Sequence, residues 1–144
     1  MCIEEAVLRS KYNVKPTHTS SELESLAQKF ADNIKLFAAY KDEIMLAGVV
    51  TYESKPTVQT QYIPSCGIGK KTGATELLLD PIITQHSSGK KYFDFGISTE
   101  KGGVHLNRGL VAYEDGFGAR AFAYDAYEVK RSNWEVPLRP TSQE

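Results

Sequence analysis

A single glycine among lysines and threonines marks the part of this chain best suited to bind an anion. The segment reads Lys70-Lys71-Thr72-Gly73-Ala74-Thr75, and three leucines follow one residue later. A helix that begins just after Thr72 leaves its first backbone N–H groups without intrahelical partners, at the positive end of the helix dipole. Such a helix start can hold a phosphate group, and Gly73 lets the ligand approach the backbone closely. The sequence therefore predicts a phosphate site at residues 70–75.

Two other glycine motifs fit this region less well. A dinucleotide fingerprint needs the pattern GxGxxG, but after Gly67 and Gly69 the next glycine, Gly73, comes one position too late. A P-loop needs a glycine directly before its Lys-Thr pair, and Lys70 stands there instead. The remaining alternative is a solvated turn whose lysines contact only water. That alternative stays open beside the phosphate site.

The composition is that of one globular domain. The 144 residues are 41% hydrophobic and 24% charged, which is enough chain to bury a core. Lysine and arginine total 17 against 18 acidic residues, so there is no overall attraction to nucleic acid or anionic lipid. The cysteines lack CxxC spacing and the histidines lack metal-ligand spacing, so we expect free thiols and no metal. With no signal peptide or membrane-length apolar run, the sequence predicts a cytoplasmic protein.

Helix and strand patterns alternate along the chain. We expect helices over Cys2–Lys11, from a cap at Ser20 or Ser21 to about Asn33, over Gly73–His86, and after Gly103 to about Glu114. We expect strands over Ile34–Tyr40, Glu43–Ser54, Thr57–Ile63, Tyr92–Ser98 and Ala119–Val129, with a turn at Lys41-Asp42 and a loop at Gly67–Thr72. Pro81 is expected to kink or restart its helix, and Asp80 can cap a restart.

The strand predicted over Tyr92–Ser98 places polar chemistry on one face. Alternation assigns Phe93, Phe95 and Ile97 to the core side, and it assigns Tyr92, Asp94, Gly96 and Ser98 to the opposite side. Asp94 could there orient or deprotonate an amine. A structural hydrogen-bond acceptor is nevertheless the commoner role for an aspartate on a strand, so both interpretations remain.

Taken in order, these motifs resemble those of GNAT-fold acyltransferases, and within them the subgroup similar to the Fem peptidyltransferases of cell-wall synthesis. In the GNAT acyl-CoA loop a basic or Gln residue, a Gly, and a Gly or Ala stand at fixed spacing; Lys70, Gly73 and Thr75 occupy these positions. Thr75 departs from the pattern. Two further landmarks resemble Fem-like motifs, namely Tyr92-Phe93-Asp94-Phe95-Gly96 and Tyr113-Glu114-Asp115-Gly116-Phe117-Gly118.

The resemblance implies an α/β (α+β) fold with a central mixed sheet flanked by helices. It covers about Pro16 to Val129, which leads us to expect a single domain over 1–144 with its core at 16–129 and a C-terminal tail or edge strand at 130–144. A complete GNAT sheet has a strand before its first helix. Because this chain opens at the position of that helix, as in the C-terminal half of a tandem Fem-like protein, we expect the first strand either to be absent or to come from a partner chain. An exposed sheet edge would favour a homodimer.

The activity that the resemblance implies is transfer of an acetyl or other acyl group from acyl-CoA to an amine of a small molecule or peptide. Its pantetheine arm would lie between two parallel strands that splay apart, along the backbone of Gln61, Tyr62 and Ile63. By resemblance, Tyr113 would protonate the leaving sulfur, although it lies one residue off the usual spacing after Asn107. The remaining candidates are Asp94 for catalysis and His18, Gly96 and Ser98 for binding the acceptor.

Two other functions remain as alternatives. A Fem-like enzyme would take an aminoacyl group from charged tRNA and extend a peptidoglycan peptide, but the weak net charge speaks against binding tRNA. A non-catalytic binding or oligomerisation module is the second alternative. The missing strand and Thr75 support it.

Overall fold

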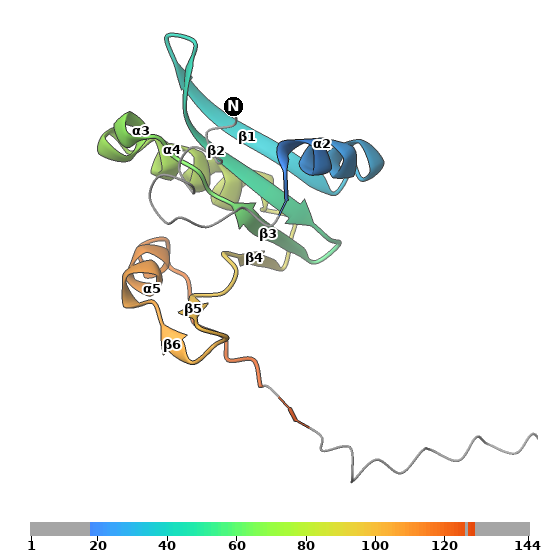
Figure 1. The fold of residues 1–144 in the computed structure, drawn as a ribbon, viewed down its shortest axis with the longest axis vertical. Helices are drawn as coiled ribbons and strands as arrows, with labels where there is room; N and C mark the ends of the chain where they lie inside the picture. The colour runs from blue at the N-terminus through green and yellow to red at the C-terminus, as the bar shows by residue number, and fades with distance from the viewer. Residues whose placement is uncertain (1–17, 126, 129–144) are drawn as a thin grey trace, which may run out of the picture.

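A central sheet organises the chain in the computed structural model, which describes residues 18–125, 127 and 128. Its strands are β1 (Ile34–Lys41), β2 (Ile44–Glu53), β3 (Thr57–Tyr62) and β4 (Tyr92–Asp94). They lie in the order β1-β2-β3-β4 (Figure 1). β2 is antiparallel to both β1 and β3, and β4 is parallel to β3. A small second sheet pairs β5 (Thr99–Glu100) with β6 (His105–Leu106). The predicted mixed sheet with flanking helices is confirmed.

The helices cover both faces of this sheet. They are α2 (Ser20–Lys29), α3 (Gly67–Thr72), α4 (Ala74–Pro81), which continues into a π-helical turn η1 (Ile82–His86), and α5 (Arg108–Asp115). Val49 of β2 packs with Leu79 and Ile82 on the α4 side. Tyr52, three positions later and so on the opposite face, lies beneath α2. The main core therefore lies between the sheet and α4, and α2 covers the other face.

The β1–β2 hairpin turns at Asp42 and Glu43, one residue later than predicted. Both residues have positive φ angles, 49° and 64°, which suits a two-residue turn that matches the twist of the flanking strands.

Helix α2 begins with a capping box, but its cap is Thr19 and not Ser20 or Ser21 as predicted. The Thr19 hydroxyl accepts from the backbone N–H of Glu22, and the Glu22 carboxylate accepts from the N–H of Thr19. The helix ends at Lys29, which is earlier than the predicted end near Asn33.

The segment predicted as a loop, Gly67–Thr72, is the short helix α3. Its N-cap is Cys66, whose sulfur accepts from the N–H of Gly69. Gly69 packs against β2 so closely that an added Cβ would lie 2.2 Å from the carbonyl oxygen of Leu46. Gly73, at φ +70°, ends α3 and redirects the chain into α4. The loop prediction was wrong because Gly69, which would usually disfavour a helix, here permits close packing against β2.

Pro81 does not restart its helix. The chain passes from α4 into η1, and the Thr84 hydroxyl donates to the carbonyl oxygen of Asp80. Asp80 therefore does not cap a new helix, and the irregularity that proline causes is absorbed as a π-helical turn.

Strand β4 is shorter than predicted. Phe93 and Phe95 pack on the core as expected, but Ile97 is 78% exposed, so its assignment to the core side was wrong. The reason lies at Gly96, whose positive φ of 96° ends the extended backbone.

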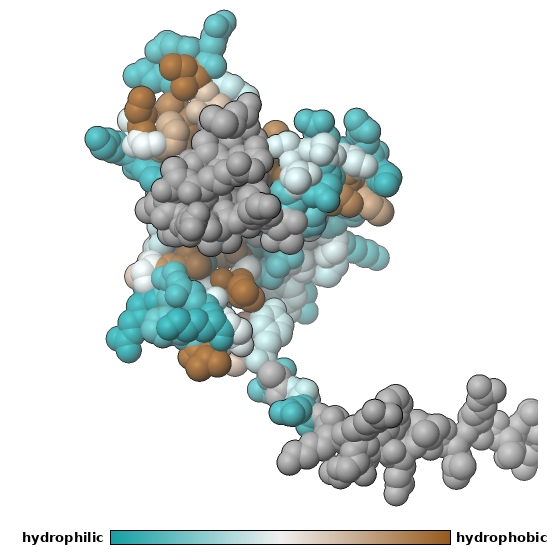
Figure 2. Space-filling view, viewed as in Figure 1, coloured by the Kyte–Doolittle hydropathy of each residue, from teal (hydrophilic) through white to brown (hydrophobic). Residues whose placement is uncertain are grey.

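The C-terminal part differs most from the predictions. Helix α5 begins at Arg108, capped by the Asn107 side chain, and β6 occupies part of the predicted helix. Residues 119–125 form neither helix nor strand, and Phe122 and Tyr124 are exposed, so the predicted strand is absent there. Figure 2 shows apolar side chains at the surface in the region of β6 and α5. Val104, before β6, and Leu106, within it, are both exposed. The predictions for Cys2–Lys11, for the missing strand and for 130–144 lie outside the described residues.

None of the helices within the described residues is both long and apolar enough to cross a membrane.

Candidate functional site

The parallel strands β3 and β4 separate partway along β3. They pair only through Thr57 with Tyr92, Val58 with Phe93, and Gln59 with Asp94. The last contact comes from the Thr60 hydroxyl, which lies 3.1 Å from the carbonyl oxygen of Phe95. Beyond it β3 continues through Tyr62, whereas β4 has ended at Asp94. The two strands therefore diverge at their carboxyl ends, where ligands bind in open sheets that contain parallel strands.

The first half of the predicted phosphate segment belongs to α3. The Lys70 N–H donates to the carbonyl oxygen of Cys66, and the Gly73 N–H donates to that of Gly69. The Thr72 hydroxyl also donates within α3, to the carbonyl oxygen of Ile68. These groups are paired within α3, so the phosphate site at residues 70–75 stays a prediction that depends on the α4 amides and on the lysine side chains.

The start of α4 has no side-chain cap. Its N-cap Gly73 has no side chain to cap it, so the first-turn amides of Ala74, Thr75 and Glu76 are the ones without intrahelical partners. Lys70 and Lys71 lie in the last turn of α3, directly before this helix start, and their side chains are exposed.

Glu76 is a feature of this helix start that the sequence interpretation missed. A Cβ placed on Gly73 would lie 3.7 Å from a carboxylate oxygen of Glu76, so this side chain folds back over the turn. A carboxylate in the first turn stabilises the helix, but it also repels a phosphate at the same place. The one sequence feature that could have predicted this is that Glu76 lies three positions after the N-cap Gly73, from where its side chain can reach back over the helix start.

Tyr113, the predicted proton donor, lies in the core between α4 and α5. Its ring packs edge-on against Phe117, and its hydroxyl is buried with no hydrogen-bond partner among the described residues. Burial and, to a lesser extent, the nearby Glu76 carboxylate raise the pKa of Tyr113 to about 12, although the two side chains do not meet in a well-formed hydrogen bond. The phenol is therefore protonated at neutral pH, as a donor must be.

Asp94 has a structural partner. Its carboxylate accepts from the N–H of Gly96 at 2.8 Å and so fixes the turn that ends β4. This is the commoner of the two roles considered for it. The Ser98 hydroxyl donates to the Glu114 carboxylate at 2.6 Å, which joins the chain after β4 to α5. Gly96 lies near β3, since an added Cβ would be 3.9 Å from the carbonyl oxygen of Thr60.

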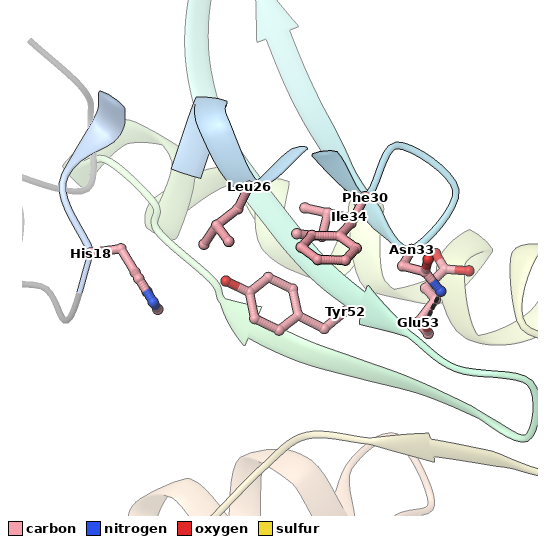
Figure 3. Close-up of a pocket in the computed structure, with 7 residues that line it drawn as sticks. All are labelled: His18, Leu26, Phe30, Asn33, Ile34, Tyr52 and Glu53. Atoms are coloured by element: carbon pink, nitrogen blue, oxygen red, sulfur yellow. Dashed lines mark hydrogen bonds between the residues drawn. The ribbon is translucent and has the colours of Figure 1, made fainter. Parts of the chain in front are cut away.

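A pocket of about 400 Å³ lies beneath α2 (Figure 3). The described residues that line it are His18, Leu26, Phe30, Asn33, Ile34, Tyr52 and Glu53. His18 stands at one end, where its Nδ1 lies 2.7 Å from the hydroxyl oxygen of Tyr62 at the carboxyl end of β3. Of the predicted site residues, the structure thus brings together His18 and Tyr62. Although Phe30 lines the pocket, it is 52% exposed.

Among residues 18–125, 127 and 128, no cluster of three histidine, cysteine or acidic side chains is arranged to hold a metal ion.

No protein-family model matches the sequence, and no curated protein matches it either. Solved structures do match. One is AAC(6')-Iy in complex with the bisubstrate analogue CoA-S-monomethyl-acetylneamine, with a TM-score of 0.61 and 15% identity over 83% of this chain and 85% of that chain. Another is the aminoglycoside 6'-N-acetyltransferase AAC(6')-IG from Acinetobacter haemolyticus, with a TM-score of 0.56 and 15% identity over 88% of this chain and 94% of that one.

A third is a protein from Xanthomonas campestris pv. campestris assigned to the GNAT family as an acetyltransferase, with a TM-score of 0.55 and 13% identity over 89% and 87% of the two chains. Identities this low show the fold alone. This chain therefore has the fold of GNAT acetyltransferases, as the motifs predicted.

Proposed function

We propose that this protein is an N-acyltransferase that moves an acetyl or other acyl group from acyl-CoA to the amine of a small molecule or peptide. The observation that carries the proposal is the divergence of β3 and β4 after three residue pairs. It leaves the β4 side of Gln61 and Tyr62 without a paired strand from β4, and an extended pantetheine arm can bind such a backbone edge. The shared fold with acetyltransferases supports the same function.

The start of α4 is the proposed site for the CoA diphosphate. The amides of Ala74, Thr75 and Glu76 would donate to phosphate oxygens, and Lys70 and Lys71 would add positive charge. Glu76 opposes this binding, so its carboxylate has to turn away when the diphosphate enters.

The reaction needs few side chains. The amine nitrogen attacks the thioester carbonyl carbon, the C–N bond forms and the C–S bond breaks. The nitrogen loses a proton, and the CoA thiolate gains one. Most of the rate enhancement comes from holding the two reactants in line. Tyr113 is the proposed donor to the thiolate, and His18 and Gly96 are proposed to lie on the acceptor side.

Calorimetric titration with acetyl-CoA tests this proposal. We expect saturable binding to the parent protein. Replacing Lys70 and Lys71 together by alanine should weaken it by about tenfold, because each removes a charge near the diphosphate. Gly73→Asp should abolish it by placing a carboxylate in the site. Lys41→Ala, an exposed lysine in the β1–β2 hairpin, is the control. No saturable heat with the folded parent protein would refute the proposal.

A further inference from the structure

We propose that the acceptor is a small amine that carries an aromatic or other apolar group, with that group bound in the pocket beneath α2. This inference rests on the proposed function and names its substrate class. Its starting point is the chemistry of the pocket wall, in which aliphatic and aromatic side chains from α2, β1 and β2 face one another (Figure 3). A wall of this kind binds apolar groups by removing them from water.

The wall offers little to a substrate with several positive charges. Glu53 is the only acidic residue among the described residues that line the pocket. Its side chain is 7% exposed, and its carboxylate oxygen Oε1 lies 2.7 Å from Nε2 of His86 and 3.1 Å from the Thr51 hydroxyl oxygen.

Lys90 adds a positive charge 3.9 Å from the second carboxylate oxygen of Glu53. His86 lies in η1 and Lys90 in the chain before β4, whereas Thr51 belongs to β2. The Glu53 charge is thus compensated inside the protein. An ammonium group buried in the pocket would meet no free carboxylate among the described lining residues, and burying an unpaired charge is costly.

The position of the pocket suits an acceptor with one amine at its end. The pocket runs from Phe30 and Ile34 to His18, and His18 contacts Tyr62 at the end of β3, where β3 and β4 have diverged. An apolar group held by Leu26, Phe30 and Tyr52 would place a short aminoalkyl chain toward His18 and the proposed thioester site. The volume of about 400 Å³ lies in the range of small-molecule pockets.

A comparison of two amines tests the inference. The released CoA thiol is measured with acetyl-CoA and either phenethylamine, which has one amine and one ring, or neamine, which has several amines. We expect kcat/KM for phenethylamine to exceed that for neamine by at least about tenfold, since apolar pockets discriminate by this order. Equal or higher kcat/KM with neamine, or no transfer to phenethylamine by protein that binds acetyl-CoA, would overturn the inference.

The variant Leu26→Arg tests whether the preference for phenethylamine depends on this pocket. Leu26→Arg should lower kcat/KM for phenethylamine by about tenfold or more, because the new side chain fills the pocket and repels the ammonium group. Heat of acetyl-CoA binding should not change. Ile44→Arg, at the exposed start of β2 beyond the pocket, is the matched control and should leave both values unchanged.

If Leu26→Arg fails to fold, Phe30→Ala replaces it, because this side chain is more than half exposed and its removal should leave the fold intact. Unchanged transfer to phenethylamine in a folded pocket variant overturns the inference. It leaves the proposed function standing, since that function fails only if the parent protein does not bind acetyl-CoA.

Discussion

Gly67 and Gly69, two positions apart in α3, differ in how closely their backbone approaches β2. Gly69 faces β2, where a Cβ would lie 2.2 Å from the carbonyl oxygen of Leu46, whereas a Cβ on Gly67 would meet nothing within 4 Å. Both occupy helical positions in α3. The close contact fixes α3, and with it the two lysines before α4, against the sheet.

This difference predicts opposite outcomes for the same substitution. Gly69→Ala should lower the free energy of unfolding by about 2 kcal/mol or more, because backbone on both sides must move apart. Gly67→Ala should leave it unchanged or raise it by up to about 1 kcal/mol, since alanine favours helix. Urea unfolding of both variants measures this. Equal effects would show that α3 is not held by this contact.

At the level of elements, the start of α2 depends on one short network. Thr19 and Glu22 exchange two hydrogen bonds, and Thr19 donates a third from its hydroxyl to the Glu22 carboxylate. The hydrogen bonds from Thr19 lower the pKa of Glu22 below its ordinary value, and the bond from the Thr19 backbone has a larger effect than the bond from its side chain. The network orients α2, and α2 supplies Leu26 to the pocket.

Thr19→Ala should lower the free energy of unfolding by about 1 kcal/mol at neutral pH, and Ser20→Ala, the control, should change it little. The pKa of Glu22 is lower in the folded state, so its contribution is present above the unfolded pKa and is lost as pH falls through the folded value. The difference between Thr19→Ala and its parent should therefore shrink below about pH 4. A larger effect from Ser20→Ala would instead favour the cap that the sequence predicted.

Local patterns predicted the strands that pair with sequence neighbours and failed where tertiary contacts decide. The strand-forming residues in Ile34–Tyr40 and Glu43–Ser54, joined by a short turn, predicted a hairpin whose strand ends agree with the structure to within one residue. The helix α3 could not be predicted, because Gly69 is explained only by its contact with Leu46 of β2. The segment 119–125 has the alternation of a strand, but a strand also needs a partner. In the candidate site, the contact between His18 and Tyr62 joins residues 44 positions apart, so no local sequence pattern could have predicted it.

At the level of the whole molecule, the sheet ends in two edges within the described residues. β1 and β4 each have one strand neighbour. Along β1, Leu36 and Tyr40 are exposed. An apolar edge strand readily pairs with another chain. We therefore propose that two copies associate through β1.

Light scattering over a range of concentrations tests this association, and a dimer is expected. Leu36→Lys should shift the mass toward the monomer, because a charged residue on an edge strand discourages pairing. Leu77→Lys, an exposed leucine on α4, is the control and should leave the mass unchanged. A parent protein that is monomeric at every concentration would refute the association.

The absence of fully buried residues in α2 has a consequence for how this protein can change. Helix α4 secures the fold from the opposite side of the sheet, so the helix that shapes the pocket contributes little to the core. Replacing the α2 side chains that face the pocket should therefore alter ligand preference while lowering the free energy of unfolding only slightly. A library randomised at Leu26 and at Phe30, the residue that caps the end of α2, should retain mostly folded members, which makes this part of the chain a suitable starting point for evolving new selectivity.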